Sequence, residues 1–342
     1  MFSCPIPHTD SDRITMACGG GGQMMNRLIE EIFLSAFGTF PSDLHDSALC
    51  PVSGDKIAMT TDSFVVNPLI FPGGDIGSLS VHGTVNDLAM SGSKPLYLSA
   101  GFILEEGLEI KTLQTIVRSM AHAAKEAGVR IVTGDTKVVE KGKGDGIYIN
   151  TCGVGAPQYK GMIAPCSIQE GDIILLSGDI GRHGMTIMSM REGLEFDSDL
   201  TSDSAALWPS VDALIRSGAC IHCLRDVTRG GLTTTLHELA GASGLSFELD
   251  EALIPVRHDV RSACEMLGLD PMQVACEGRY IIIVPQESQE QALAALRSVE
   301  VSQEAKTIGV VRASGPTLSM KNVLGVKRIL SMPSGAQLPR IC

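Results

Sequence analysis

The alternation of its apolar runs constrains the fold of this chain more than any other feature. Four short apolar runs, typical of β-strands, cover residues 57–61, 96–104, 129–133 and 147–152. A helical spacing of apolar residues between 113 and 124 lies between the second and third runs. Because strands and a helix mix within one stretch of chain, the sequence predicts that the first half forms an α/β domain.

The second half repeats this style after an interruption. A turn-rich stretch at residues 153–171 breaks the periodicity, and a predicted strand at 173–177 follows it. Helices are then predicted at 207–217, 232–240 and near 287–297, with a strand at 280–284. The length of 342 residues corresponds to about two domains of roughly 150 residues. We therefore expect a second α/β domain.

Four segments follow from these patterns. Residues 1–40 form a Gly-rich segment and an amphipathic helix at 23–37, residues 41–160 an N-terminal domain, and residues 161–331 a C-terminal domain. Residues 332–342 carry Pro333, Gly335 and Pro339 and no periodicity. We expect this tail to be mobile and to lack contacts with the core.

The charge balance excludes several function classes. The chain has 27 Lys and Arg against 39 Asp and Glu, a net charge of −12, with no basic block. This argues against a nucleic-acid partner or an anionic membrane partner. No apolar run approaches the roughly 18 residues of a membrane span, and ten cysteines without regular spacing indicate reduced thiols. The sequence predicts a cytoplasmic protein in which metal ions or backbone amides would bind any phosphates.

Three aspartates stand where a cation site is plausible. Asp62 and Asp135 directly follow predicted strands, and Asp87 lies in a similar polar context after Asn86. Carboxylates at strand ends are well placed to converge on a crevice, and hard oxygen ligands suit Mg²⁺ with bound phosphates. For each aspartate taken alone, the alternative is a helix cap or a turn former.

Two glycine-rich segments are candidates for binding phosphate through backbone amides. Asp226 precedes Gly230 and Gly231, which open a predicted helix whose free N–H groups attract anions. Cys18 precedes four glycines at 19–22, whose amides could approach a polyphosphate. No Walker loop follows these glycines, and a flexible hinge is the alternative interpretation.

Three cysteines deserve separate interpretation. Cys220 and Cys223 have the spacing of a redox or zinc pair, but no second pair completes a four-ligand site, so ordinary thiols are the alternative. The terminal Cys342 follows Arg340, which favours a thiolate. A ten-residue tail can span up to about 33 Å. Such a thiol could visit two sites in turn, although a terminal cysteine can also be incidental.

Several segments taken together resemble the HypE family of hydrogenase maturation factors. They are residues 19–22, Thr61-Asp62-Ser63-Phe64-Val65-Val66, Phe71-Pro72-Gly73-Gly74-Asp75-Ile76-Gly77, Gly83-Thr84-Val85-Asn86-Asp87-Leu88-Ala89-Met90-Ser91-Gly92, Gly134-Asp135-Thr136-Lys137-Val138-Val139, Asp226-Val227-Thr228-Arg229-Gly230-Gly231 and the terminal Pro339-Arg340-Ile341-Cys342. The likeness begins at about residue 12. The internal motifs are shared with the aminoimidazole ribonucleotide synthetase and selenophosphate synthetase superfamily, whereas the terminal motif is specific to HypE. HypE chains usually carry His where Cys18 stands.

The resemblance implies a two-domain aminoimidazole ribonucleotide synthetase-like fold that binds ATP and Mg²⁺ in residues 41–160 and forms a homodimer through the N-terminal sheet. It also implies a carbamoyl dehydratase activity. The partner HypF, a carbamoyltransferase, would place a carbamoyl group on Cys342, and this chain would convert the thiocarbamate to a thiocyanate with ATP. Cyanide would then pass to iron held by the HypC–HypD complex, towards nickel–iron hydrogenase.

The resemblance also assigns residues. It implies that Asp62, Asp87, Asp135 and Asp226 hold Mg²⁺ and ATP. The further ATP contacts that it implies are Gly20, Gly21, Gly22, Asn86, Thr136, Arg229 and Gly230. Lys137 and Glu277 would face the modified thiol; as a base, Lys137 would need a lowered pKa.

Other interpretations of these residues remain open. A salt bridge to Arg279 is the alternative for Glu277. A second possible activity is a selenophosphate-synthetase-like kinase with Cys18 as the reactive thiol, although Gly21 stands where that pattern has Lys. A third is a non-enzymatic nucleotide-binding scaffold that presents Cys342 to partners.

Overall fold

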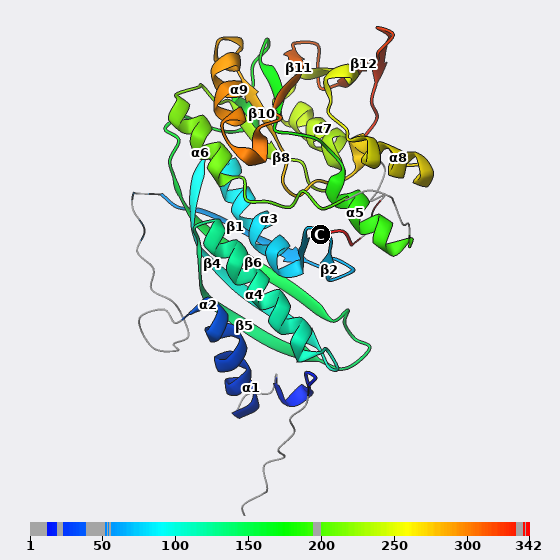
Figure 1. Ribbon diagram of the computed structural model, residues 1–342. Helices are drawn as coiled ribbons and strands as arrows, with labels where there is room; N and C mark the ends of the chain where they lie inside the picture. The colour runs from blue at the N-terminus through cyan, green and yellow to red at the C-terminus, as the bar shows by residue number, and fades with distance from the viewer. Residues whose placement is uncertain are drawn as a thin grey trace, which may run out of the picture.

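The computed structural model describes residues 12–18, 23–38, 52, 54, 56–193, 200–332, 338 and 340–342. Within these residues the chain forms two α/β bodies, one above the other in Figure 1. Gly20, Gly21 and Gly22 lie outside the described residues, so their contact with ATP stays a prediction.

A four-stranded sheet with the strand order β1-β6-β4-β5 forms the N-terminal body. Its strands are β1 (Ala58–Phe64), β4 (Ser93–Glu105), β5 (Arg130–Val139) and β6 (Ile147–Pro157). The helices α3 (Ile76–Met90) and α4 (Ile110–Glu126) pack on one face of this sheet (Figure 1). The four predicted strands and the predicted helix at 113–124 are confirmed, and every element is longer than predicted.

Helix α3 was not predicted from the sequence. Its first turn is capped by Asp75, whose Oδ1 accepts hydrogen bonds from the backbone N–H groups of Gly77 (2.8 Å) and Ser78 (3.0 Å). All of its residues are buried except His82 and Asp87, which are half-buried. Because the helix is covered on nearly every side, its sequence has no polar face and therefore no helical periodicity to detect.

The predicted helix at 23–37 is confirmed as one continuous helical segment, made of α1 (Gln23–Leu28), a π-helical turn (Ile29–Leu34) and α2 (Ser35–Phe37). It packs against the N-terminal body, where the ring of Phe33 lies 4.8 Å from that of Phe102 on β4. A short hairpin of β2 (Ile70–Phe71) and β3 (Gly74–Asp75) precedes α3.

A seven-stranded sheet with the order β13-β12-β9-β11-β7-β10-β8 forms the C-terminal body. Helix α7 covers one face of the sheet, and helices α6 and α9 cover the other. The strands are β7 (Ile173–Leu176), β8 (Cys223–Asp226), β9 (Ser246–Asp250), β10 (Tyr280–Val284), β11 (Lys306–Arg312), β12 (Leu318–Lys321) and β13 (Lys327–Ile329); the α-helices are α5 (Arg182–Arg191), α6 (Trp208–Ser217), α7 (Gly231–Ser243), α8 (His258–Leu267) and α9 (Gln289–Arg297). The elements predicted in this half are confirmed, and the two-domain α/β fold is confirmed with them.

The placement of three aspartates differs from the prediction. Asp62 lies inside β1 and Asp135 inside β5, whereas Asp87 lies on α3, so none of the three ends a strand. Strand β1 continues past its predicted run through Asp62, Ser63 and Phe64, and β5 continues past its run through residues such as Thr136. Thr136 has high β-propensity without being apolar.

The end of the tail is packed into the molecule. Leu338 and Ile341 are buried in the core cluster that also contains Met185 of α5. The expectation that the tail lacks core contacts is therefore wrong for its described residues.

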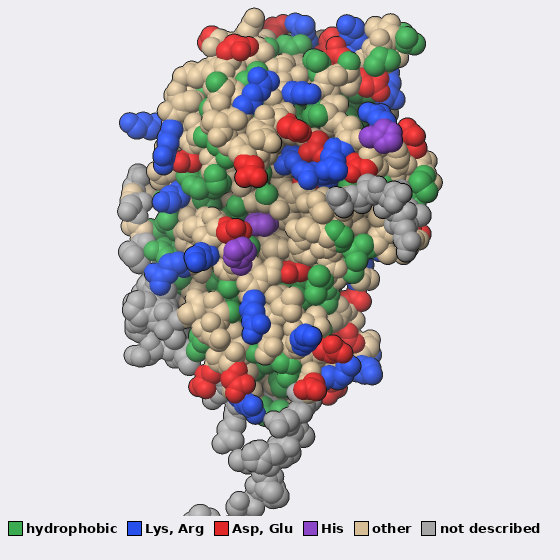
Figure 2. Space-filling model, in the orientation of Figure 1, with side chains coloured by type: hydrophobic (Ala, Val, Ile, Leu, Met, Phe, Trp, Pro, Cys, Tyr) green, Lys and Arg blue, Asp and Glu red, His purple; other side chains and the backbone are tan. Residues whose placement is uncertain are grey.

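Surface and membrane features complete this description. On the face shown in Figure 2, acidic and basic side chains are interspersed rather than gathered in one block. Within the described ranges, no helix is long and apolar enough to cross a membrane.

Candidate active site

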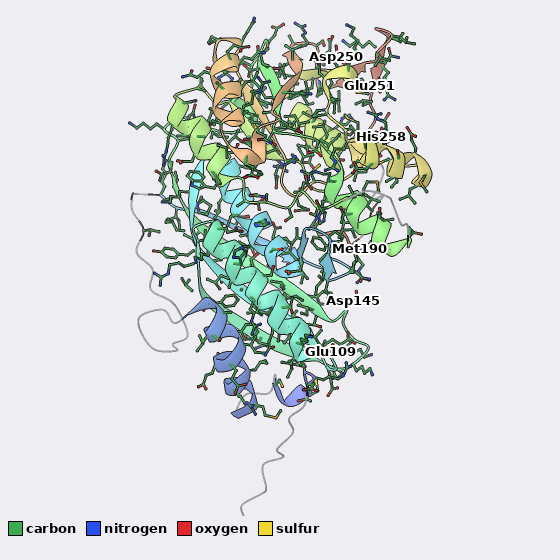
Figure 3. The ribbon with its side chains drawn as sticks, in the orientation of Figure 1. Glu109, Asp145, Met190, Asp250, Glu251 and His258 are labelled. Atoms are coloured by element: carbon green, nitrogen blue, oxygen red, sulfur yellow. The ribbon has the colours of Figure 1, made fainter. Side chains whose placement is uncertain are left out.

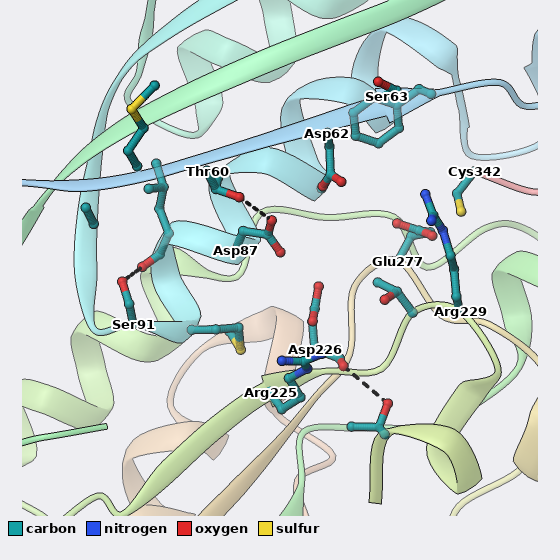
Figure 4. A pocket seen from close by; sticks show the side chains of 18 of the residues that line it. Thr60, Asp62, Ser63, Asp87, Ser91, Arg225, Asp226, Arg229, Glu277 and Cys342 are labelled. Atoms are coloured by element: carbon teal, nitrogen blue, oxygen red, sulfur yellow. Dashed lines mark hydrogen bonds between the residues drawn. The ribbon is translucent and has the colours of Figure 1, made fainter. Parts of the chain in front are cut away.

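A cavity of about 720 Å³ lies between the two bodies and contains the candidate site. The N-terminal body contributes β1 and α3 to its wall, and the C-terminal body contributes β8 and the segments that follow β8 and precede β10 (Figure 4). The polar and charged residues that line it are Thr60, Asp62, Ser63, Asp87, Ser91, Arg225, Asp226, Thr228, Arg229, Thr235, Glu238, Glu277 and Cys342. The cavity thus brings five of the predicted acidic and thiol residues together.

Asp62, Asp87 and Asp226 concentrate negative charge in this cavity, which Arg225 and Arg229 offset only in part. Burial, followed by the charge of Asp87, raises the pKa of Asp62 to about 6, although Arg229 opposes the shift. Burial and then Asp87 raise the pKa of Asp226 to about 7. Asp87 accepts a hydrogen bond of 2.7 Å from the Thr60 hydroxyl, yet burial still raises its pKa.

These three aspartates fit a hard divalent cation by their chemistry, because oxygen ligands and unbalanced negative charge are what Mg²⁺ requires. The side chains of the described residues do not form a ready cluster of three or more metal ligands. Phosphate oxygens would have to complete the coordination of a cation here.

Glu277 lies in the segment just before β10 and is 4% exposed. Its Oε1 has no hydrogen-bond partner among the described residues. Burial, followed by the charges of Asp226, Asp203 and Asp62, raises the pKa of Glu277 well above its usual value, which favours its neutral form. The alternative of an ion pair with Arg279 is wrong, because Arg279 Nη2 binds Asp179 Oδ1 at 2.7 Å.

Cys342 reaches the same cavity from the docked tail. Figure 4 shows its sulfur beside Arg229, with Glu277 between Arg229 and the aspartates. Burial, followed by the negative charge of Glu277 when ionised, raises the pKa of the Cys342 thiol to about 12, and Arg229 acts in the opposite direction. The docked thiol is therefore protonated and a poor nucleophile.

Backbone contacts to both bodies hold the tail. The Val65 N–H donates to the Cys342 carbonyl at 3.3 Å, and the Asn67 N–H donates to the Arg340 carbonyl at 3.2 Å. Arg340 pairs with Asp145, which lies in the connection between β5 and β6 below the tail (Figure 3). Arg191 of α5 donates to the Arg340 carbonyl from the C-terminal body, so the tail bridges the two bodies.

Other predicted site residues lie elsewhere. Asp135 and Lys137 form an exposed ion pair on β5, with 2.9 Å between Lys137 Nζ and Asp135 Oδ2. Strand β5 is three strands away from β1, about 14 Å across the sheet. Thr136 is buried on the opposite face of β5. A single chain does not bring these three residues to its own cavity.

The contacts of Asn86 and Gly230 stabilise the fold rather than the cavity. The Asn86 amide donates to the carbonyls of Ala205 (3.0 Å) and Glu277 (3.3 Å) and accepts from the Leu207 N–H (2.7 Å). The Asn86 side chain therefore joins α3 to the C-terminal body. Gly230 is the N-cap of α7 in a left-handed conformation with φ of 75°, at the predicted start of this helix.

The remaining cysteine candidates lie outside the cavity. Cys18 is 6% exposed and belongs to the N-terminal core. Cys223 is buried, which raises its pKa to about 12, whereas Cys220 is exposed. The environment of Cys223 is therefore not that of a low-pKa reactive thiol.

Sequence reasoning missed several cavity residues, among them Thr60, Ser91, Thr228 and Glu238. Thr60 directly precedes the Thr-Asp motif, and this position was its only signal in the sequence. Ser91 directly follows α3, and Glu238 lies on α7. Both reach the cavity only because of how these helices are oriented, which no single sequence reveals.

Comparison with known proteins places this architecture in a class. The N-terminal domain model of AIR synthase related proteins matches residues 44–156, and the C-terminal domain model matches residues 169–321. The two bodies with an acid-lined cavity between them are therefore those of an AIR synthase related protein.

Individual relatives narrow this class. The chain is 51% identical over 331 residues to the carbamoyl dehydratase HypE of Azotobacter vinelandii, covering 96% of this chain and 97% of that protein. Among solved structures, it matches a hydrogenase maturation protein HypE in complex with ATP with a TM-score of 0.92 and 47% identity, over 96% of this chain and 99% of the other. It also matches a HypE–HypF complex with a TM-score of 0.79 and 45% identity, over 90% and 99% of the two chains. This chain belongs to the HypE family.

Proposed function

We propose that this chain is an ATP-dependent carbamoyl dehydratase that acts on its own C-terminal cysteine. The observation that carries the proposal is the position of the Cys342 thiol, at the end of a docked tail and inside the acid-lined cavity. The relatives named carbamoyl dehydratase and the relative solved with ATP support the same activity. The product would be a thiocyanate, the source of the cyanide ligand for the iron of nickel–iron hydrogenase.

The reaction removes the elements of water from a thiocarbamate on Cys342. The carboxamide oxygen attacks the γ-phosphorus of ATP, forming one P–O bond while the bond to ADP breaks. The C–O bond then breaks as phosphate leaves, and the nitrogen loses both protons to give the C≡N bond. One proton ends on phosphate and the other is released, so the products are thiocyanate, ADP and phosphate.

Glu277 is the residue that we assign to the first proton. Burial, followed by the charge of Asp226, raises the pKa of its carboxyl group in the ligand-free chain. Asp62, Asp87 and Asp226 would hold Mg²⁺ together with ATP, and its positive charge would balance these acids. Glu277 can then ionise beside Arg229 and accept the proton, a contribution of about 10²–10⁴ in rate.

Asp135 and Lys137 enter the proposal through a homodimer. They project from the face of the N-terminal sheet opposite to α3 and α4, where Met59 (69% exposed) and Ile103 (43% exposed) are also uncovered. We infer that two copies pair through this face, and that each copy extends Asp135 and Lys137 towards the cavity of the other. In such a dimer, Asp135 and Lys137 could take their predicted roles in the partner's cavity, although β5 lies three strands away from β1 in their own chain.

Two partners complete the proposed pathway. HypF would carbamoylate Cys342, a role supported by the relative solved as a HypE–HypF complex. The HypC–HypD complex would receive the cyanide on its iron.

Mass spectrometry of the chain after incubation with HypF, carbamoyl phosphate and ATP tests the proposal. We expect the wild type to gain a carbamoyl group on Cys342 and then lose one water. Glu277→Gln should accept the carbamoyl group and then dehydrate about 10²–10⁴ times more slowly. Cys342→Ala should gain nothing. An adduct on Cys18 or Cys220, or full-rate dehydration in Glu277→Gln, would contradict the assignment.

A further inference from the structure

His183 contacts the docked tail from a completely buried position that the proposed chemistry does not use. It lies in the first turn of α5 and is 0% exposed. Its Nε2 lies 2.6 Å from the carbonyl oxygen of Ile341, the residue next to the reactive cysteine. A buried histidine against the peptide bond that precedes Cys342 requires an explanation.

The hydrogen-bond pattern defines the state of the ring. A carbonyl oxygen can only accept, so His183 Nε2 must carry a proton and donate it to Ile341. In the neutral ring Nδ1 is then an acceptor, and the Ser202 hydroxyl donates to it at 2.8 Å. Ser202 Oγ in turn accepts the Ser204 N–H at 3.0 Å. Burial lowers the pKa of His183, which keeps the ring in this neutral form.

The ring is also fixed sterically. The backbone N–H of His183 donates to Asp203 Oδ1 at 3.1 Å, and the Phe71 ring meets the imidazole edge-on at 5.4 Å between centroids. The next residue, Gly184, lets the tail approach closely, because an added Cβ there would lie 3.2 Å from Leu338 Cδ1. The contacts with Ser202, Asp203 and Phe71 fix the donor without involving the tail.

We propose that His183 is a positioning residue for the dehydration: its Nε2–H binds the Ile341 carbonyl and thereby fixes the Cys342 sulfur in the cavity. The inference rests on the proposed function only in taking Cys342 as the carrier of the carbamoyl group. His183 touches neither the thiol nor the cavity and acts through one peptide bond of the tail.

Alkylation of the full-length chain by iodoacetamide measures this anchoring directly. The docked thiol is protonated, so Cys342 reacts mainly when the tail is undocked. Cys166 and Cys220 are exposed and serve as internal controls in the same molecule. The rate at each cysteine is read by peptide mass spectrometry, without ATP or a partner protein.

We expect His183→Phe, which keeps the ring but removes the donor, to speed alkylation of Cys342 by about tenfold, the effect of one buried hydrogen bond. The rates at Cys166 and Cys220 should not change. His183→Gln retains an N–H donor near the same place and should restore most of the protection. Ser202→Ala should speed Cys342 alkylation by a smaller factor, and it supplies the test if His183→Phe does not fold.

Three results would overturn the proposal. Unchanged Cys342 alkylation in folded His183→Phe would show that the contact does not hold the tail. Equal acceleration at all three cysteines would indicate general loosening, and equal acceleration in the Phe and Gln variants would assign the effect to ring packing.

Dehydration is measured separately, on chains that are already carbamoylated. His183→Phe should be slower, and His183→Gln should recover the rate. Normal dehydration in a variant with an undocked tail would reject the positioning role while leaving the dehydratase assignment intact; loss of dehydration in every chain, wild type included, would reject the dehydratase and leave the alkylation result valid.

Discussion

Asp87 differs from the other acids of the cavity in being tied to its surroundings. Its Oδ2 accepts the Thr60 hydroxyl, so one oxygen already has a partner while the other faces the cavity. Removing its charge should remove part of the compensation for phosphate and cation that a chain of net charge −12 must assemble. Asp87 therefore serves as the residue with which to test the cation site.

We expect Asp87→Asn to weaken Mg·ATP binding by at least about tenfold, or about 1.4 kcal/mol. Asparagine keeps the size of the side chain and can still accept from Thr60. Isothermal titration calorimetry measures the affinity, and Asp212→Asn, at a surface ion pair with Arg216, is the control. An unchanged affinity would return Asp87 to a structural role on α3.

His82 should make the stability of the fold sensitive to acid. It lies on α3 with Nδ1 2.9 Å from Ser204 Oγ, and burial lowers its pKa to about 4. An unfolded histidine has a pKa of about 6.5, so the unfolded chain binds more protons between these values. His82 therefore lowers the free energy of unfolding as the pH falls from about 6.5 towards about 4.

Replacing His82 by Gln should flatten this part of the stability curve. Urea unfolding of the wild type and of His82→Gln, at a series of pH values between about 4 and 7, measures the slope. His122→Gln is the matched control, because His122 is an exposed histidine on α4. A slope that is the same in all three proteins would show that His82 does not titrate in this window.

At the scale of elements, the turn before β10 depends on a glycine. A Cβ on Gly278 would lie 1.8 Å from the carbonyl oxygen of Asp203, a backbone atom that cannot move aside cheaply. Gly278 stands between Glu277 and Arg279, so displacing it would move the acid of the cavity. The close approach joins the segment before α6 to the edge of the site.

Gly278→Ala should therefore lower the free energy of unfolding by about 2–4 kcal/mol, because the clash is with backbone. Gly241→Ala on α7 is the matched control: an added Cβ there meets nothing within 4 Å, and alanine should stabilise the helix by about 0.5–1 kcal/mol. Chemical denaturation measures both. Similar free energies of unfolding for the two variants would show that the backbone at Asp203 moves to accommodate the added Cβ.

Among the helices that cover the N-terminal sheet, the sequence predicted the one whose two faces differ and missed the one that is buried almost throughout. Helix α4 has one apolar face and was predicted, whereas α3 has almost no polar face and was not. In the site, Asp62, Asp87, Asp226, Glu277 and Cys342 were predicted to act together, and the structure brings them to one cavity. His183 could not be predicted, because its role depends on the docking of a tail 158 residues away.

At the scale of the whole molecule, the positions of Lys137 and Glu277 predict that the two chains of a dimer contribute residues to each active site. If each cavity uses Lys137 from one copy and Glu277 from the other, Lys137→Ala and Glu277→Gln chains should each be nearly inactive alone. A mixed dimer would still contain one complete site. Equal mixing should therefore restore about a quarter of the wild-type activity, since half of the dimers are mixed and each has one intact site of two.

Dehydration of carbamoylated chains after mixing and subunit exchange measures this recovery. Sedimentation of the wild type tests for the proposed dimer, and Ile103→Glu, on the uncovered face of the sheet, should dissociate it. No recovery on mixing, in chains shown to exchange, would place Lys137 outside the partner's cavity. A monomeric wild type would reject the pairing altogether.

The tail is gripped by its carbonyls and by side chains upstream of the cysteine, through Val65, Asn67 and His183. None of these contacts involves the sulfur. These three contacts would therefore be the same for a bare, a carbamoylated and a cyanated cysteine. Arg229, which hydrogen-bonds the Cys342 side chain, is the contact that a change at the sulfur would alter. Release of the product would then depend on Arg229 rather than on the backbone contacts of the tail.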